Sequence, residues 1–435
     1  MASAGKQRIL LLCTTTGYQT QSMVDAAQKL GLEVVFATDR CHVLPDPWQD
    51  GAIAVRFESP EAGAAKIVDY ARRHPLAGVV CVGDSPTPTA ARVAQTLGLP
   101  GHPPEAADIC RDKYLSRERL REGGLRVPAF RRWSTDDDPR AIAPQVRFPC
   151  VLKPLALSAS RGVIRANNCE EFVAAFERIR ALLKSPDVAV LREDTSNFVQ
   201  VEDYIDGVEV AVEGLMDHGR LRILAIFDKP DPLTGPFFEE TIYVTPSRLP
   251  EATQKEIANT LAAAVRALRL YDGPLHAELR ISGSQGRDEV WVMEVAARPI
   301  GGLCSKTLRF RIPLVDEQVS LEDVLIRLAL GADVSRVQPD LSASGVMMIP
   351  IPGTGFLEEV RNVELAIAQS GIFDINITAK PGQKLVPLPE GSSYLGFIFA
   401  RASTPQQVED ALRAAHTKLD FVIAPALPIL GAPTR

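Results

Sequence analysis

Short apolar runs and helix-like segments alternate through the first hundred residues, and this alternation limits the possible folds more than any other feature of the chain. Strands are expected at 8–15, 33–38 and 76–83, and amphipathic helices at 21–31, 61–74 and 88–98. A strand followed by a helix, three times over, predicts a parallel, doubly wound sheet with helices on both faces.

Ligands of such sheets bind beyond the carboxyl ends of the strands. The loop after the first strand, CTTTGYQTQ, lacks the pattern G-x-G-x-x-G, so a dinucleotide fingerprint is absent. Asp84 directly follows the third strand and is therefore a candidate pocket residue, although capping of the next helix is the more ordinary role for an aspartate at such a position.

The chain has 435 residues, which is too many for one hydrophobic core, so several domains are expected. A net charge of −6 argues against a general binder of nucleic acid or of membrane surfaces, which would carry a basic field. The seven cysteines form no C-x-x-C pair and are odd in number, which argues against a zinc site or a disulfide framework. Such cysteines fit a reducing cytoplasm, where we expect the protein, and no apolar run approaches the ~20 residues that a membrane span requires.

Changes in composition and in the expected elements divide the chain into four parts. The segment LPGHPPEAA marks a boundary near residue 104, a larger mixed sheet is expected from about 200 to 310, and three further strands and one helix follow it. The helix begins at Pro405, with Thr404 as its N-cap. We expect domains at 1–112, 113–200, 201–340 and 341–435.

Two strands near residue 285 carry acidic side chains in otherwise apolar sequence. They are LHAELRIS and VWVMEVAA, joined by the turn-forming segment SGSQGRDE. A turn centred on Gly286 would place Glu278 directly opposite Glu294, with roughly 4.5–5.5 Å between their Cβ atoms. The alternation of side chains along the second strand assigns Trp291, Met293, Val295 and Ala297 to the core, and Glu294, Ala296 and Arg298 to the opposite face.

Two carboxylates placed so close together repel each other unless a proton or a cation lies between them. Hard oxygen ligands on one small patch suit Mg²⁺, which binds one or two protein carboxylates together with phosphate oxygens. Arg298, on the same face, would then meet transferred phosphoryl or oxyanion charge. The alternative that stays open is a surface hairpin with ordinary cross-strand ion pairs.

Three further features suggest an anionic ligand, although each is weak alone. Lys153 lies in the apolar strand FPCVLKP, where its ammonium group must reach water or an anion. The following loop holds Ser158, Ser160 and Gly162, and loops of small residues allow backbone N–H groups to surround a phosphate. Glu202 and Glu209 flank the bend of VEDYIDGVE, which is equally consistent with a hairpin that carries exposed acids.

The order of these motifs resembles that of the ATP-grasp superfamily: RDKYLSRERL, FPCVLKP, the small-residue loop, VEDYIDGVE, HAEL and EVAARPIGG. The resemblance implies α/β and α+β architecture, with a Rossmann-like N-terminal domain, an ATP-grasp fold of two α+β subdomains, and a small C-terminal α+β subdomain. It also implies ATP and Mg²⁺ or Mn²⁺ as cofactors.

Within that superfamily the chain is most similar to the L-amino acid ligases, which include dipeptide synthetases, and to carnosine-synthase-type enzymes, through GPLHAEL, EVAARPIGG and GPFFEETIYVTPS. The resemblance implies an ADP-forming enzyme that joins a small carboxylate to an amine through an acyl phosphate, as a homodimer. The resemblance also implies a role for each matching position. For the nucleotide, these are phosphate contacts for Lys113 and Lys153, a mobile loop holding Ser158, Ser160 and Gly162, adenine contacts for Glu202 and the main chain of Asp203 and Ile205, and a ribose contact for Glu209.

For the reaction, Glu278 and Glu294 would bind magnesium and Arg298 would stabilise charge. Glu240 would bind the amine, with Tyr243 and His276 as further candidates near it.

Two positions depart from the family pattern. Many ATP-grasp enzymes have asparagine two residues after the second metal-binding glutamate, where this chain has Ala296, and the phosphate loop contains Ala159 and Arg161 instead of glycine. A carboxylase or purine-pathway ligase of the same fold, and a non-catalytic nucleotide-binding regulator, are the alternatives that the sequence leaves open.

Overall fold

The computed structural model describes residues 6–14, 18–39, 52–284, 287–313 and 315–425. The N-terminal part forms the parallel sheet that the alternation predicts, in the strand order β3-β2-β1-β4. Its strands are β1 (Arg8–Cys13), β2 (Glu33–Thr38), β3 (Ile53–Ala54) and β4 (Gly78–Val82), and its helices are α1 (Thr20–Lys29), α2 (Pro60–Arg73), α3 (Thr87–Leu97) and α4 (Pro104–Arg111).

Both faces of this sheet are covered, which explains why β1 is apolar at successive positions. Leu10 and Leu12 pack into a cluster with side chains of α2 and α3. Ile9 and Leu11 belong to a different cluster, which includes α1 and the distant helix α10 (Leu321–Ala329). The N-terminal sheet is therefore completed by a helix that lies about three hundred residues further along the chain.

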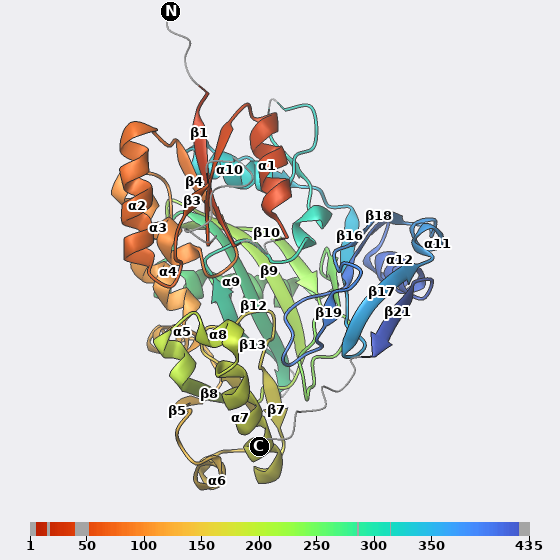
Figure 1. Ribbon diagram of the computed structural model, residues 1–435. Coiled ribbons are helices and arrows are strands. Elements are labelled where there is room, and N and C mark those ends of the chain that lie inside the picture. The colour runs from red at the N-terminus through yellow and green to blue at the C-terminus, as the bar shows by residue number, and fades with distance from the viewer. Residues whose placement is uncertain (1–5, 15–17, 40–51, 285–286, 314, 426–435) are drawn as a thin grey trace, which may run out of the picture.

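A second α+β unit follows and is drawn at the bottom of Figure 1. Its sheet has the order β5-β8-β6-β7, with all three pairs antiparallel. The strands are β5 (Phe130–Ser134), β6 (Cys150–Pro154), β7 (Ile164–Ala166) and β8 (Phe198–Asp203), and the helices are α5 (Lys113–Glu122), α6 (Pro139–Ile142), α7 (Cys169–Leu183) and α8 (Pro186–Ala189). We call residues 113–203 the lid.

The central sheet has eight antiparallel strands in the order β13-β12-β9-β10-β11-β16-β20-β18. Helices α9 (Glu251–Ala267) and α12 (Pro405–His416) pack against it. The strands are β9 (Val208–Asp217), β10 (Arg220–Asp228), β11 (Ile242–Thr245), β12 (Gly273–Ser284), β13 (Arg287–Ala296), β16 (Ala343–Ile349), β18 (Ile372–Ile377) and β20 (Gly396–Ala402).

The central sheet continues across residue 341, because β11 pairs directly with β16. The C-terminal residues add a small sheet of β19 (Lys384–Leu385), β17 (Gly355–Arg361) and β21 (Asp420–Pro425), with helix α11 (Val363–Ile367). A two-stranded ladder joins β14 (Phe310–Arg311) to β15 (Gln338–Pro339). The expected boundaries at 112, 200 and 340 stay predictions.

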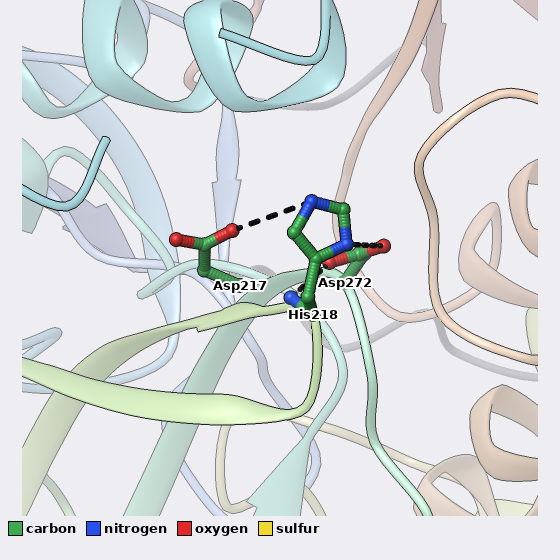
Figure 2. A group of neighbouring side chains, drawn as sticks. All are labelled: Asp217, His218 and Asp272. Carbon is green, nitrogen blue, oxygen red and sulfur yellow. Dashed lines mark hydrogen bonds and ion pairs between the residues drawn. The ribbon is translucent and has the colours of Figure 1, made fainter. Parts of the chain in front are cut away.

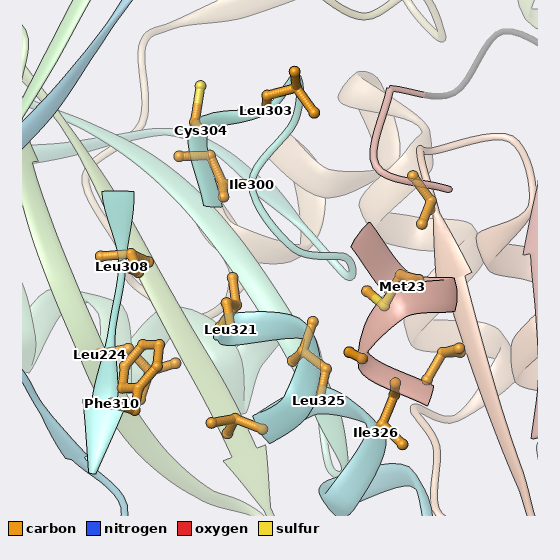
Figure 3. Close-up of a cluster of buried hydrophobic side chains, with 14 of the residues drawn as sticks. Met23, Leu224, Ile300, Leu303, Cys304, Leu308, Phe310, Leu321, Leu325 and Ile326 are labelled. Carbon is orange, nitrogen blue, oxygen red and sulfur yellow. The ribbon is translucent and has the colours of Figure 1, made fainter. Parts of the chain in front are cut away.

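One apolar cluster fastens the N-terminal sheet to the central sheet. Figure 3 shows Met23 of α1 facing Leu325 and Ile326 of α10, with Leu224 of β10 and Cys304 on the far side of α10. This cluster packs Val82, at the carboxyl end of β4, together with Ala211 of β9, the strand that pairs with β12. Among the described residues, no helix is both long enough and apolar enough to cross a membrane.

The hairpin of β12 and β13 has the predicted pairing of Glu278 with Glu294, but a different register near the turn. From Ser284 to Leu279 the pairs are displaced by one residue, so that Leu279 faces Val292, and a β-bulge between Glu278 and Leu279 restores the predicted pairing beyond it. The turn residues 285–286, including the expected centre Gly286, lie outside the described residues.

The bulge corrects the predicted faces of β13. Val290 and Val292 join Val295 and Ala297 in the core, whereas Met293 turns toward the cavity described below. The assignment of Trp291 and Met293 to the core was therefore wrong, because an extra residue in one strand reverses the alternation beyond it. The N–H of Val292 donates to the carbonyl oxygen of Arg126 (3.1 Å), and the Arg117 side chain donates to the carbonyl oxygen of Met293. Groups from outside the hairpin therefore make the hydrogen bonds that the bulge removes from the ladder.

Candidate active site

A large cavity lies where the lid, the central sheet, the N-terminal sheet and the C-terminal residues meet. Its wall includes all but one of the residues to which the family resemblance assigned a role. Those that line it are Lys113, Lys153, Ser158, Ser160, Glu202, Asp203, Ile205, Glu209, Glu240, Tyr243, His276, Glu278, Glu294 and Arg298. The exception is Gly162, whose backbone N–H donates to the carbonyl oxygen of Pro389 (2.8 Å).

Glu278 and Glu294 occupy directly opposite positions on β12 and β13 and both face the cavity. A lysine ammonium group lies 3.5 Å from each carboxylate: Lys229 from Glu278, and Lys113 from Glu294. Burial raises the pKa of Glu278 well above its usual range, and the neighbouring acids Glu240 and Glu209 raise it further against the attraction of Lys229. Hard oxygen donors that face one space suit a divalent metal ion.

The position two residues after Glu294 holds Ala296, which is buried and faces His276 across the ladder. It offers no ligand atom, so this chain would hold a metal ion with Glu278 and Glu294 and without a side chain at that position.

Lys229, directly after β10, is at the centre of the acidic side of the cavity, and the sequence analysis missed it. Its ammonium group bonds to Glu209 (2.8 Å) and to Glu240, and lies 3.5 Å from Glu278. These carboxylates present oxygen atoms that all lie within 4.8 Å of one another, an arrangement that could otherwise hold a metal ion. Burial opposes the charge on Lys229, but the three acids outweigh it and raise the pKa of Lys229 well above its usual range.

Glu209 is also held by Arg280 of the neighbouring strand β12. The guanidinium donates to the Glu209 carboxylate from Nε (3.1 Å) and Nη2 (2.8 Å), and from Nη1 to the carbonyl oxygen of Ile205 (2.8 Å). Burial opposes ionisation of Glu209, yet Lys229 and Arg280 lower the pKa of its carboxyl group. Glu209 is therefore an ionised, fixed acceptor at the end of the cavity near Ile205.

A buried ion network fixes the side chain of Lys153 on β6. Its ammonium group lies 2.7 Å from Glu202, which also accepts from Arg117 (2.7 Å) and Gln200 (2.6 Å). Burial lowers the pKa of Lys153, and the two cations hold the pKa of Glu202 at about 2 against the effect of burial. The Glu202 side chain thus orients Lys153, a contact that the sequence analysis did not assign to it.

Lys113 reaches the cavity from the first turn of α5, whose N-cap Asp112 accepts from the N–H groups of Tyr114 and Leu115. Its ammonium group donates to the carbonyl oxygen of Leu157 (2.8 Å) and lies 3.5 Å from Glu294. Lys113 and Lys153 therefore approach the same space from a helix and a strand of the lid.

The loop between β6 and β7 bends through left-handed backbone conformations at Ala159, Ser160 and Gly162. Ser158 and Ser160 face the cavity, as expected. Arg161 points the other way, donating to the carbonyl oxygen of Glu390 (2.7 Å) and pairing with Asp187 (2.6 Å). The loop is tied to the C-terminal residues instead of standing free above the cavity.

Arg298 pairs with Asp84 at the carboxyl end of β4, with 2.7 Å between Nε and the Asp84 carboxylate. Burial disfavours ionisation of Asp84, but the guanidinium outweighs it and lowers the pKa of that carboxyl group. The N-cap of α3 is Pro86, so the capping role expected for Asp84 was wrong and its candidacy as a pocket residue is supported.

His276 lies on β12, opposite Ala296 of β13 on one side and Glu213 of β9 on the other. Its Nδ1 is 3.2 Å from Glu213, which also accepts from the N–H of Ile300 (3.0 Å). Burial lowers the pKa of His276 well below its usual range and raises that of Glu213 well above. A neutral imidazole in the cavity wall results.

A second group of possible metal ligands, Asp217, His218 and Asp272, lies at the turn between β9 and β10 (Figure 2). The His218 backbone N–H donates to Asp272 (2.6 Å), and the exposed ring lies 3.5 Å from the same carboxylate. None of these residues lines the cavity that holds Glu278 and Glu294.

Comparison with known proteins supports the fold described above. Sequence models of the ATP-grasp N-terminal domain, the ATP-grasp domain and the L-amino acid ligase C-terminal domain 2 match residues 24–101, 146–307 and 347–424. An uncharacterized protein of Sinorhizobium fredii is 26% identical over 98% of this chain and 85% of its own length.

Alanine–anticapsin ligase of Bacillus subtilis is 30% identical over 48% of this chain, and the match spans 46% of that enzyme. The crystal structure of L-amino acid ligase from Bacillus licheniformis superposes with a TM-score of 0.76 at 24% identity, over 96% of this chain and 99% of that one. Phosphoribosylglycinamide synthetase from Anaerococcus prevotii superposes with a TM-score of 0.66 at 16% identity, over 96% and 100%.

The domain matches follow one another along the chain in the order of the parts seen in the structure. The fold prediction is thereby confirmed: an N-terminal α/β part, an ATP-grasp core, and a C-terminal part of the kind found in L-amino acid ligases. The chain contains an ATP-grasp domain and is similar to the L-amino acid ligases.

Proposed function

We propose that this protein joins an amino acid or another small carboxylate to an amine, using ATP, through an acyl phosphate, and releases ADP and phosphate. The observation that carries the proposal is the position of Glu278 and Glu294, which face each other between the lid lysines and Arg298 in one cavity. A relative named for ligation of alanine matches 48% of the chain, and the family model of the L-amino acid ligase C-terminal domain 2 matches residues 347–424.

The lid supplies the groups that would hold the nucleotide. Lys113 and Lys153 direct two ammonium groups into the cavity, where they would neutralise phosphate oxygens. The main chain at Asp203 and Ile205 borders the same end of the cavity and would meet the adenine edge, with Glu209 accepting from ribose hydroxyls. We assign Ser158 and Ser160 to the phosphates as well.

Glu278 and Glu294 would hold Mg²⁺ or Mn²⁺, which neutralises phosphate charge and aligns the transferring group. Phosphoryl transfer to a carboxylate depends on positioning and charge neutralisation more than on covalent chemistry by the protein. Arg298, fixed by its bond to Asp84, is positioned to stabilise negative charge on the reacting carboxylate.

Glu240 would bind the substrate amine, because its carboxylate lines the cavity beside Tyr243. His276 has its Nδ1 committed to Glu213 and is kept neutral by burial, so we assign it to the wall and to positioning. The interior would exclude water while the acyl phosphate exists, which requires the lid to be closed during the reaction.

The test is a screen of the purified protein for ATP turnover with Mg²⁺ and pairs of small carboxylates and amines. We expect ADP and phosphate release that depends on the carboxylate, and a condensed product by mass spectrometry. AMP and pyrophosphate would contradict the acyl-phosphate route. ATP hydrolysis that depends on bicarbonate instead would identify a carboxylase, and nucleotide binding without turnover on any pair would identify a regulator.

A further inference from the structure

We propose that Tyr394 sets the side-chain size accepted at the substrate end of the cavity, and that this end takes an α-amino acid with an apolar side chain. The inference rests on the proposed ligase function and adds to it the class of the carboxylate that is activated. Tyr394 belongs to the C-terminal residues, which lie outside the matched ATP-grasp core at 146–307.

The cavity has two ends of different origin. The lid end is walled by side chains around Ile205, among them Val151, Tyr204, Leu233 and Phe238. The opposite end is walled by side chains that belong to, or pack against, the cluster that joins the N-terminal and central sheets: Tyr18, Tyr243, Ile300, Cys304, Met348 and Tyr394. The metal-site pair and Arg298 line the same cavity and are not part of that cluster.

The positions proposed for the nucleotide and the metal ion decide which end of the cavity takes the nucleotide and which takes the carboxylate substrate. A nucleotide at Lys153 and Ile205 would occupy the lid end and present its terminal phosphate to Glu278 and Glu294. The carboxylate that receives the phosphoryl group must then approach from the other side, so that its side chain enters the end walled by Tyr18, Met348 and Tyr394.

The charged and polar side chains near this end each bond to another group of the protein. Asp84 is bonded to Arg298 (2.7 Å) and Glu240 to Lys229, while the Gln19 amide donates to the carbonyl oxygen of Ile300. The side chains that wall this end, such as Ile300, Met348 and Tyr394, offer no counter-ion of their own, so a charged substrate side chain lying against them would lose its water without compensation, which is costly. An apolar side chain loses nothing of this kind and gains contact with the aromatic wall.

The α-amino and carboxylate groups of such a substrate still find partners at the mouth of this end. Arg298 can take the carboxylate, and the acids Asp84 and Glu240 can take the ammonium group, because carboxylate oxygens accept more than one hydrogen bond. The combination of one cation, two acids and an apolar wall is what an apolar amino acid requires.

Tyr394 is held in place by neighbouring rings instead of projecting freely. Its ring centre lies 6.0 Å from that of Phe397, and Tyr18 packs edge-on against the same ring at 5.3 Å. Phe397 in turn presses on Gly302, where an added Cβ would lie 2.9 Å from a ring carbon. Because neighbouring rings support it, the Tyr394 ring is held rigidly and can limit the size of the substrate side chain that fits at this end.

The experiment measures activation of the carboxylate by trapping the acyl phosphate with hydroxylamine as a hydroxamate. Wild-type protein, Tyr394→Ala and Tyr394→Phe are compared on glycine, alanine, valine, leucine, phenylalanine, aspartate and lysine. Leu365→Ala, at an exposed site on α11, is the control for a C-terminal substitution.

We expect wild-type protein to favour apolar side chains over aspartate and lysine. Tyr394→Ala should raise kcat/KM for phenylalanine relative to alanine by about tenfold or more, because the ring no longer limits depth. Tyr394→Phe should keep the wild-type ratio, and the KM for ATP should be unchanged in both variants.

Two results would overturn the inference: an unchanged phenylalanine-to-alanine ratio in Tyr394→Ala, or a wild-type preference for charged side chains. Failure of the proposed function is distinct, since then no carboxylate supports hydroxamate formation by wild-type protein. Should Tyr394→Ala not fold, Tyr394→Leu and Tyr394→Trp give the same comparison, with the ratio rising and falling respectively.

Discussion

Lys229 shows how a single side chain can make a crowded acidic site tolerable. Glu209 of β9, Glu278 of β12 and Glu240 before β11 would repel one another in the absence of a cation, and the Lys229 ammonium group touches all three. The Lys229 side chain is 3% exposed, so solvent does not screen these interactions. Lys229 is thus a positioning residue that leaves Glu278 aimed at the proposed metal site.

Replacing Lys229 by methionine keeps an unbranched side chain, one atom shorter, and removes the charge. We expect a loss of about 3–5 kcal/mol in the free energy of unfolding, because three partly buried acids lose their shared partner. Ligase activity should fall by at least about 100-fold. Lys380→Met, at an exposed site, is the matched control, and a Lys229→Met protein with wild-type stability by urea unfolding would contradict this role.

The proposed metal site gives a second prediction at the scale of one residue. Glu294→Gln keeps the shape of the side chain but removes the charge that would bind Mg²⁺, so turnover should fall by about 10²–10³-fold with an unchanged circular dichroism spectrum. The control is Glu289→Gln on the same strand, which lies outside the cavity wall. Activity near that of wild-type protein would show that Glu294 is not a metal ligand.

Among the elements, the loop between β6 and β7 is controlled by a segment far away in the sequence. Pro389 accepts from the N–H of Gly162, and the Glu390 carbonyl oxygen accepts from Arg161. The Glu390 carboxylate also takes a bidentate pair from Arg178 of α7, with 2.8 Å from Nη2. The C-terminal segment therefore holds the lid at its loop and at its helix.

Removing the carboxylate in Glu390→Ala should loosen the lid without changing the cavity. We expect amide hydrogen exchange in residues 158–164 to become several-fold faster, because local opening loses one of its restraints. Hydrolysis of ATP without product formation should also rise, since water reaches the acyl phosphate. Glu364→Ala, exposed on α11, should do neither.

The β12–β13 hairpin is the second element whose details carry function. The predicted pairing of Glu278 with Glu294 was confirmed, although the register beside the turn differs by one residue. The bulge reconciles the two and turns Met293 into the cavity. Strand alternation by itself could not place this extra residue, because its cost is offset by bonds from Arg117 and Arg126, which lie in other parts of the chain.

At the scale of the whole molecule, His102 lies between the N-terminal sheet and the central sheet. The ring is buried, with Nε2 2.8 Å from the carbonyl oxygen of Pro274 and Nδ1 accepting from the N–H of Tyr271 (3.3 Å). Nε2 therefore carries the proton of a neutral ring. Burial lowers the pKa of His102 to about 4 from an ordinary value of 6.5.

This pKa shift predicts a pH dependence of stability. The unfolded chain binds a proton at His102 more readily than the folded protein, so the free energy of unfolding should fall as the pH is lowered from 6.5 toward 4. The contribution is about 3 kcal/mol for a shift of this size. Below pH 4 this group should contribute no further change.

His102→Gln should remove that part of the pH dependence, because an amide can make both hydrogen bonds without titrating. Urea unfolding of wild-type protein and of the variant, each measured at pH 7 and pH 4.5, compares the two losses. The exposed His74→Gln supplies the control. Equal losses of stability in wild-type protein and His102→Gln would show that protonation of His102 does not cause this pH dependence.

The sequence by itself determined the parallel N-terminal sheet, the presence of an ATP-grasp core, and the acidic pair at Glu278 and Glu294. The sheet and the acidic pair depend on the periodicity of neighbouring residues, and the ATP-grasp core on the order of short motifs along the chain. Both can be read without knowledge of tertiary contacts. The sequence also singled out Lys153, because a lysine in an apolar strand stands out without knowledge of its surroundings, whereas Lys113 was named only through the resemblance carried by RDKYLSRERL.

Only the tertiary structure decided the partners of those residues. Asp84 meets Arg298 over 214 positions of sequence, Arg178 meets Glu390 over 212, and Tyr394 reaches a cavity built largely by other parts of the chain. Pairings of this kind depend on how the sheets pack against one another, and packing is a property of surfaces that form only after distant segments have come together.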